Sequence, residues 1–201
     1  MTTLAIDIET YSDISLTECG VYKYVDSANF RILLFAYAFN DEEVKIIDLA
    51  CGEKLPDRVM KALLDKNVVK TAFNAQFERV CINKYFNIKT ENWECTMIKA
   101  LSLGLPGSLD SVGKVIGLEP DQQKLMTGKN LIRIFSLPRK VKKNNQISMF
   151  EEKIRILPED RPEEWTLFKE YCMRDVETER AIRKKLTKFE TLPQEKKLYE
   201  L

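Results

Sequence analysis

Histidine is absent from the 201-residue chain, and glycine and proline number only seven each. Without imidazole there is no Ser-His-Asp or Cys-His nucleophile system, no histidine general base and no histidine-ligated zinc site. Acid–base chemistry therefore falls to carboxylates, tyrosine, lysine or metal-bound water. The low glycine and proline counts, with 44% apolar residues, exclude a disordered chain and indicate a globular domain with its own core.

Cysteine pairs and long apolar runs are also missing. The five cysteines are scattered without a CxxC motif, which argues against a disulfide framework or a zinc site and favours a reducing compartment. No apolar run approaches the roughly 18 residues that span a bilayer, and the N-terminus enters a strand-like pattern without a basic leader. We therefore expect a soluble, cytoplasmic protein with no membrane partner.

The charges are balanced overall, with 32 basic and 31 acidic residues, but they are unevenly distributed. Residues 1–60 carry 11 acidic and 5 basic side chains, whereas residues 121–150 carry 1 acidic and 7 basic. Residues 138–146 (PRKVKKNNQ) lack apolar periodicity, which predicts an exposed loop. Taken alone, this stretch is interpreted as a solvated surface loop.

Apolar periodicity predicts an α/β domain. Residues 31–40 and 44–49 are strands joined by a short polar turn, so they pair as an antiparallel hairpin and the sheet must be mixed. No internal repeat is present. The predicted strands are 3–9, 31–40, 44–49 and 68–73, and the predicted helices are 56–64, 77–85, 96–103, 108–116 and 162–186.

The first candidate site is the pair Asp7 and Glu9. Residues two apart in a strand project from one face, about 6–7 Å apart along the backbone. Like charges this close repel each other, and a divalent cation between them relieves the repulsion. The alternative is a solvated outer face of a half-buried strand, which the pair alone does not exclude.

Two further acids accompany polar or aromatic neighbours. Asn74 and Glu78 stand where a buried strand gives way to a helix, the edge at which open α/β sheets place active sites; Glu78 alone is also typical of a surface acid that complements a helix dipole. Tyr171 and Asp175 are four apart in the last helix and share one face. The pair is compatible with a core-edge tyrosine beside a solvated acid, or with a phenol that orients a metal-activated water.

The order of these patterns resembles the three motifs of the DEDD exonuclease superfamily, in its tyrosine-bearing branch. The other branch places a histidine near its final aspartate, which a histidine-free chain cannot supply. Flanking segments resemble the N-terminal region of bacteriophage family A DNA polymerases. These segments are 7–13 (DIETYSD), 19–24 (CGVYKY), 32–39 (ILLFAYAF), 73–79 (FNAQFER), 103–109 (LGLPGSL) and 168–177 (FKEYCMRDVE).

The resemblance implies an RNase H-like α/β fold with a mixed, mostly five-stranded sheet flanked by helices. It implies a single 3′-5′ exonuclease domain over residues 1–201 with a basic loop insertion around 136–150. The implied activity is metal-dependent hydrolysis at the 3′ end of single-stranded or frayed DNA, as proofreading in phage DNA replication in the host cytoplasm. A polymerase domain or subunit is a further expected partner.

The resemblance also implies roles for individual residues. Asp7, Glu9 and Asp175 would hold the Mg²⁺ or Mn²⁺ ion that binds the attacking water, and Asp7 would bridge to a second ion with Glu78 in the outer position. The superfamily usually has aspartate where this chain has Glu78, so the carboxylate reaches one methylene further. Tyr171 would orient the attacking water, because a phenol with a pKa near 10 is a poor base at neutral pH.

Substrate contacts are expected from the neighbours of the motifs and from the basic stretch, whose Lys and Arg side chains suit the phosphate backbone. They are Thr10, Asn74, Phe77, Arg139, Lys140, Lys142 and Lys143.

Two alternatives stay open from the sequence. One is a catalytically weak module of the same fold that docks DNA or a polymerase. The other is an RNA-directed 3′-5′ exonuclease, since nothing in the chain reveals whether a 2′-hydroxyl is accepted. The sequence also leaves open whether this is an excised domain or a stand-alone protein.

Overall fold

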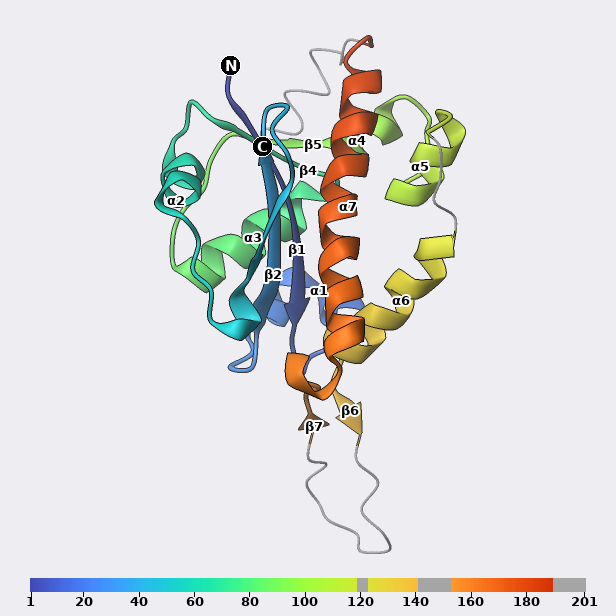
Figure 1. The fold of residues 1–201 in the computed structure, drawn as a ribbon. Helices are drawn as coiled ribbons and strands as arrows, with labels where there is room; N and C mark the ends of the chain where they lie inside the picture. The colour runs from blue at the N-terminus through green and yellow to red at the C-terminus, as the bar shows by residue number, and fades with distance from the viewer. Residues whose placement is uncertain (119–122, 141–152, 190–201) are drawn as a thin grey trace, which may run out of the picture.

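The computed structural model describes residues 1–118, 123–140 and 153–189, and it centres on a mixed five-stranded sheet of order β3-β2-β1-β4-β5 (Figure 1). β1 pairs antiparallel with β2 and parallel with β4, β3 extends the β2 edge antiparallel, and β5 extends the β4 edge parallel. This confirms the expected α/β class. The strands of this sheet are β1 (Thr3–Tyr11), β2 (Arg31–Phe39), β3 (Lys45–Asp48), β4 (Val69–Ala72) and β5 (Trp93–Cys95).

Helices cover both faces of the sheet (Figure 1). α1, α2 and α3 pack their apolar side chains against one face, and α6 and α7 pack against the other. α4 and α5 close a smaller cluster against the C-terminal part of α7. The helices are α1 (Leu16–Asp26), α2 (Asp57–Leu64), α3 (Ala75–Phe86), α4 (Thr96–Ser102), α5 (Leu109–Val115), α6 (Gln123–Phe135) and α7 (Pro162–Leu186).

β1 is the central strand, and its residues alternate between the two layers. Leu4, Ile6 and Ile8 are buried among α1, α2 and α3, whereas Ala5 and Tyr11 are buried on the side of α6 and α7. The ladder with β2 shifts register between residues 9 and 10. Such irregularities re-aim side chains and occur often beside active sites.

α7 is held against the sheet near its N-terminus. Trp165 Nε1 donates a hydrogen bond of 2.7 Å to Asp48 Oδ2 at the end of β3, and Lys169 Nζ lies 3.6 Å from the same carboxylate oxygen. Because Trp165 and Asp48 are both buried, this charge-assisted bond fixes where α7 begins.

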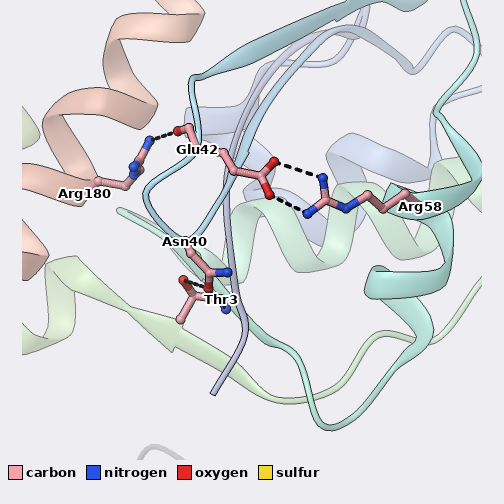
Figure 2. A network of polar contacts seen from close by, with 5 residues as sticks. All are labelled: Thr3, Asn40, Glu42, Arg58 and Arg180. Atoms are coloured by element: carbon pink, nitrogen blue, oxygen red, sulfur yellow. Dashed lines mark hydrogen bonds and ion pairs between the residues drawn. The ribbon is translucent and has the colours of Figure 1, made fainter.

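A second network ties the turn after β2 to α7 and α2 (Figure 2). Arg180 Nη1 donates to the main-chain oxygen of Glu42 at 2.9 Å, and Arg58 binds both carboxylate oxygens of Glu42 at 2.6 and 2.9 Å. The Thr3 main-chain N–H donates to Asn40 Oδ1 at 2.9 Å, which holds the start of β1 to the same turn. α7 is therefore fixed along its length, and with it the side chains that it presents to β1.

The structure departs from the predicted elements in several places. The helix over 162–186 is confirmed with the same bounds, but α1, β5 and α6 were not predicted. Within the expected basic loop, β6 (Arg139–Lys140) pairs with β7 (Lys153–Ile154), which follows the loop, and residues 141–152 between them lie outside the described chain. Among the described residues, no helix is long and apolar enough to cross a membrane.

Candidate active site

Four carboxyl groups from three elements face one another beside β1. Asp7 and Glu9 come from β1, Glu78 from the first turn of α3 and Asp175 from the middle of α7. The pKa of Asp7 is raised well above its ordinary value by burial and then by the charges of Asp175, Glu9 and Glu78. Burial, Asp175 and Glu78 raise the pKa of Glu9 in the same way. The structure thus brings together the four acids of the three sequence motifs.

Glu78 is the most confined of these acids. Its side chain is buried, and Oε2 has no hydrogen-bond partner among the described residues. Burial, opposed by the Glu78 main-chain N–H and assisted by the charge of the nearby Glu179, raises its pKa to about 8. A buried carboxylate oxygen without a partner is costly unless it is protonated or binds a cation.

The donor set suits a hard divalent cation, because all four candidate ligands are carboxylates and Glu78 offers an unpaired oxygen. In the described part of the chain, however, no three acidic or cysteine side chains are close enough together to coordinate one metal ion. The residues present therefore fit Mg²⁺ or Mn²⁺ in chemistry, and ion binding requires their side chains to move closer together.

Tyr171 lies one helical turn before Asp175, on the same face of α7. Burial raises the pKa of the phenol, followed by the charges of Asp175, Glu9 and Asp7. Burial also raises the pKa of Asp175 to about 7, and the hydrogen-bonding contact with Tyr171 acts to lower it. The phenol is therefore protonated at neutral pH and is available as a hydrogen-bond donor rather than a base.

The position of the Tyr171 ring depends on a glycine in α6. A Cβ atom added at Gly128 would lie 2.4 Å from Cε2 and 2.7 Å from Cδ2 of Tyr171, closer than van der Waals contact allows. The ring also stacks with Phe168, at 9° between ring planes and 6.4 Å between centroids. Figure 1 shows α6 running beside the N-terminal half of α7, where this contact occurs. Sequence reasoning did not identify Gly128, because a single glycine in a helix gives no sign of what it contacts.

Two more side chains support the acids. Cys172 Sγ donates to Asp7 Oδ2 at 3.3 Å, which holds that carboxylate against α7. Glu179, one turn beyond Asp175, is buried and accepts hydrogen bonds from Thr96 and, at 3.4 Å, from Thr71. Sequence reasoning missed both, although the i, i+4 spacing extends the Tyr171 and Asp175 stripe to Glu179.

The residues expected to contact the substrate do not all lie beside the acids. Thr10 is buried on the opposite side of β1, where its hydroxyl and the Tyr24 hydroxyl are hydrogen-bonded at 2.8 Å. Asn74 is exposed at the start of α3, and the partly buried Phe77 packs near Tyr24 with 6.2 Å between ring centroids. The Thr10 side chain therefore does not join the acids, whereas Asn74 and Phe77 flank Glu78 at the start of α3.

The basic residues expected to contact DNA are only partly described. Arg139 and Lys140 form β6, of which the backbone pairing is described and the side chains are not. Lys142 and Lys143 lie outside the described residues.

The 3′-5′ exonuclease family matches residues 2–189 of the chain. The chain belongs to this family. A DNA polymerase of Bacillus phage SP02 is 51% identical over 203 residues, a match that takes in the whole of this chain and 30% of the polymerase. The chain therefore spans about a third of the length of this relative. The resemblance to the exonuclease region of phage DNA polymerases, expected from the motifs, is confirmed.

Two solved structures are similar to the chain. The catalytic core of RRP6 from Trypanosoma brucei is 17% identical, with a TM-score of 0.50 over 92% of this chain and 40% of that one. NrnC from Brucella melitensis is 15% identical, with a TM-score of 0.49 over 98% of this chain and 80% of that one. The expected RNase H-like fold is confirmed by the sheet order and the likeness to the RRP6 core.

Proposed function

We propose that this exonuclease domain depends on divalent metal ions and hydrolyses phosphodiester bonds at the 3′ end of single-stranded or frayed DNA. The observation that carries the proposal is the convergence of four buried or partly buried carboxyl groups from β1, α3 and α7, with the Tyr171 phenol beside them. Four neighbouring carboxylates repel one another and destabilise the metal-free protein, whereas bound cations would compensate their charge.

Each acid has a defined part in this proposal. Asp7, Glu9 and Asp175 would hold one Mg²⁺ or Mn²⁺ ion, and Asp7 with Glu78 would hold a second. When bound, the two ions would supply an activated water and offset the charge that develops on the phosphate oxygens. The unpaired Oε2 of Glu78 supports its assignment to the outer position, where its longer side chain reaches from α3.

Tyr171 would orient the attacking water. Its raised pKa keeps the phenol protonated, so it holds the water through a hydrogen bond and does not remove a proton from it. Gly128 and Phe168 support this role, because the close approach of α6 and the stacked Phe168 ring restrict the position of the Tyr171 ring.

The biological role is proposed from the relative. Its name is DNA polymerase, and this chain matches 30% of its length. An exonuclease of this kind, joined to or associated with a polymerase, would remove nucleotides from a primer end that has frayed after misincorporation. Proofreading of phage DNA synthesis is therefore the proposed role.

The direct test uses a single-stranded DNA labelled at its 5′ end. With Mg²⁺ we expect a ladder of products shortened from the 3′ end, and no ladder with a chelator or with Asp7→Ala. A ladder that persists in chelator would contradict the metal-dependent mechanism. DNA binding without any ladder would indicate a docking module, and faster cleavage of a matched RNA would indicate an RNA-directed enzyme.

A further inference from the structure

A polar pocket lies at the carboxyl end of β1. It has a volume of about 180 Å³, and its lining residues come from the end of β1 and the loop after it, the start of β2 and the loop before it, and the segment between β7 and α7. The lining consists of Tyr11, Asp13, Asn29, Arg31 and Arg155. Two guanidinium groups thus meet a carboxylate, an amide and a phenol in one small space.

Arg155 is the unusual member of this pocket. Its Nε atom is buried and has no hydrogen-bond partner in the described segments, and its guanidinium carbon lies 5.6 Å from the centroid of the Tyr11 ring. Burial lowers the pKa of this guanidinium, which is still charged at any physiological pH. The next residue, Ile156, is buried in the core beside α7 and fixes the main chain at this point. A buried cationic donor without an acceptor is costly, and an anion in the pocket would satisfy it.

The other polar groups of the pocket are already positioned. Arg31 Nη1 donates to the main-chain oxygens of Ala28 at 3.0 Å and Phe30 at 2.7 Å, which holds the guanidinium at the pocket wall. The Asp13 carboxylate accepts hydrogen bonds from Ser27 and, at 3.0 Å, from Asn29 Nδ2. The wall residues therefore already have fixed positions in the absence of a ligand, and the Nε–H of Arg155 is the donor left without an acceptor.

The pocket is next to the carboxylate centre. Tyr11 follows Glu9 by two residues. Tyr11 packs on the side of β1 that faces α7, and Glu9 interacts electrostatically with Asp175 and Tyr171 of α7. Two residues of strand span about 6–7 Å. A nucleic acid strand whose scissile phosphate lies at the acids would therefore have its next phosphate within reach of the pocket.

We propose that this pocket binds the phosphate on the 5′ side of the scissile one, through Arg155 with Arg31 at its wall. The inference rests on the proposed function, because the terminal nucleotide removed by a 3′-5′ exonuclease contributes only the scissile phosphate. Any further phosphate that the domain holds belongs to the strand that remains. Charge-assisted hydrogen bonds from arginine are the contacts that suit a phosphate.

Two dinucleotides that differ in a single phosphate test the pocket. dTpdT carries only the scissile phosphate, and pdTpdT adds the next one at its 5′ end. We expect the wild type to cleave pdTpdT with a kcat/KM about tenfold higher, the size of one charged hydrogen bond. We expect Arg155→Gln to lower kcat/KM for pdTpdT to the level of dTpdT, whereas Arg58→Gln, on α2 and bound to Glu42, keeps the preference.

If Arg155→Gln keeps the preference, or slows both dinucleotides equally, the pocket does not bind this phosphate and Arg155 only packs on Tyr11. Equal melting temperatures of the two variants would exclude a difference in folding. If the wild type cleaves neither dinucleotide nor a longer strand, the proposed function fails instead.

The pocket is then tested by binding alone, with fluorescently labelled oligothymidylate. The slope of log affinity against log salt concentration should fall by about 0.7 in Arg155→Gln, the contribution of one single-strand phosphate contact. An unchanged slope would overturn the proposal whatever the enzyme activity.

Discussion

The two faces of β1 show opposite uses of burial by one strand. On the side of α1 to α3, Leu4, Ile6 and Ile8 are removed from water, which stabilises the fold. On the side of α7, Asp7 and Glu9 are placed in surroundings that raise their pKa values, which destabilises the charged protein. Burial on the apolar face therefore offsets the destabilising effect of the acidic face. Substitutions on the acidic face should mainly change activity, and substitutions on the apolar face should mainly change stability.

The largest effect is expected on the acidic face. Asp7→Asn keeps the volume of the side chain but removes a candidate ligand, so exonuclease activity should fall by more than about a hundredfold, the loss typical of changes around a metal site. Without added metal the variant should melt at a higher temperature than the wild type, because the cost of burying this carboxylate and its repulsion by the neighbouring acids are both removed. Activity assays and thermal melts check both. If the variant retains full exonuclease activity, Asp7 is not a metal ligand of the active site.

Displacement of Tyr171 should have the next largest effect. Gly128→Ala places a methyl group against the ring, and a shift of about 1 Å in a catalytic group can cost about a hundredfold in rate. In a Tyr171→Phe background, which lacks the hydroxyl, the same change should cause little further loss of kcat.

A Tyr171→Ala background provides the control for Gly128. There the added methyl group no longer meets the Tyr171 ring, and the preference of helices for alanine over glycine should stabilise the protein by about 1 kcal/mol. If Gly128→Ala keeps full activity beside an intact Tyr171, the close contact does not position the phenol.

A substitution on the apolar face of β1 should lower the stability of the protein and leave its activity unchanged. Ile8 is buried in the core under α1 to α3, so Ile8→Ala should lower the free energy of unfolding by about 2–5 kcal/mol. The kcat of the folded fraction should remain close to that of the wild type. Urea unfolding measures the loss, and a selective fall in kcat would show that the two faces are not independent.

A smaller, pH-dependent effect is expected from Glu78. Its pKa is about 8 in the folded protein and 4.5 ordinarily, so between these values the folded state retains a proton that the unfolded state loses. The contribution of Glu78 to the stability of the metal-free protein is therefore full below about pH 4.5 and declines as the pH rises towards 8. Melts of the wild type relative to Glu78→Gln check the sign, and a contribution that grows with pH contradicts it.

The smallest effect is expected at Thr10, which faces the apolar side. Thr10→Val removes the buried hydrogen bond to Tyr24, at about 1 kcal/mol of stability, and should leave the exonuclease rate unchanged. A marked loss of rate with little loss of stability would instead support the expected substrate contact at this residue.

Much of the sheet could be predicted, because long apolar strands and one hairpin leave clear periodicity. α1 could not, since Gly20 interrupts it with a φ of 74°, and β5 is only three residues long. α6 was hidden in a basic stretch, although Leu131 and Phe135 lie four apart and are both buried.

The candidate site divides in the same way. The motif order identified the acids and Tyr171, and the fold brings them together. The contacts of Gly128, Glu179 and Arg155 depend on packing between distant segments, and no local pattern in the sequence reports such contacts. The roles of all these residues remain predictions.

A Mn²⁺ soak of crystals, read by anomalous diffraction, shows whether these carboxylates bind metal ions. The expected result is anomalous density among Asp7, Glu9 and Asp175, with their carboxylates drawn together, and a second peak within reach of Glu78. Crystals of Asp7→Asn, soaked identically, should show weakened or absent peaks. Density elsewhere in the wild type, or none at these acids under conditions that support DNA cleavage, would contradict the account.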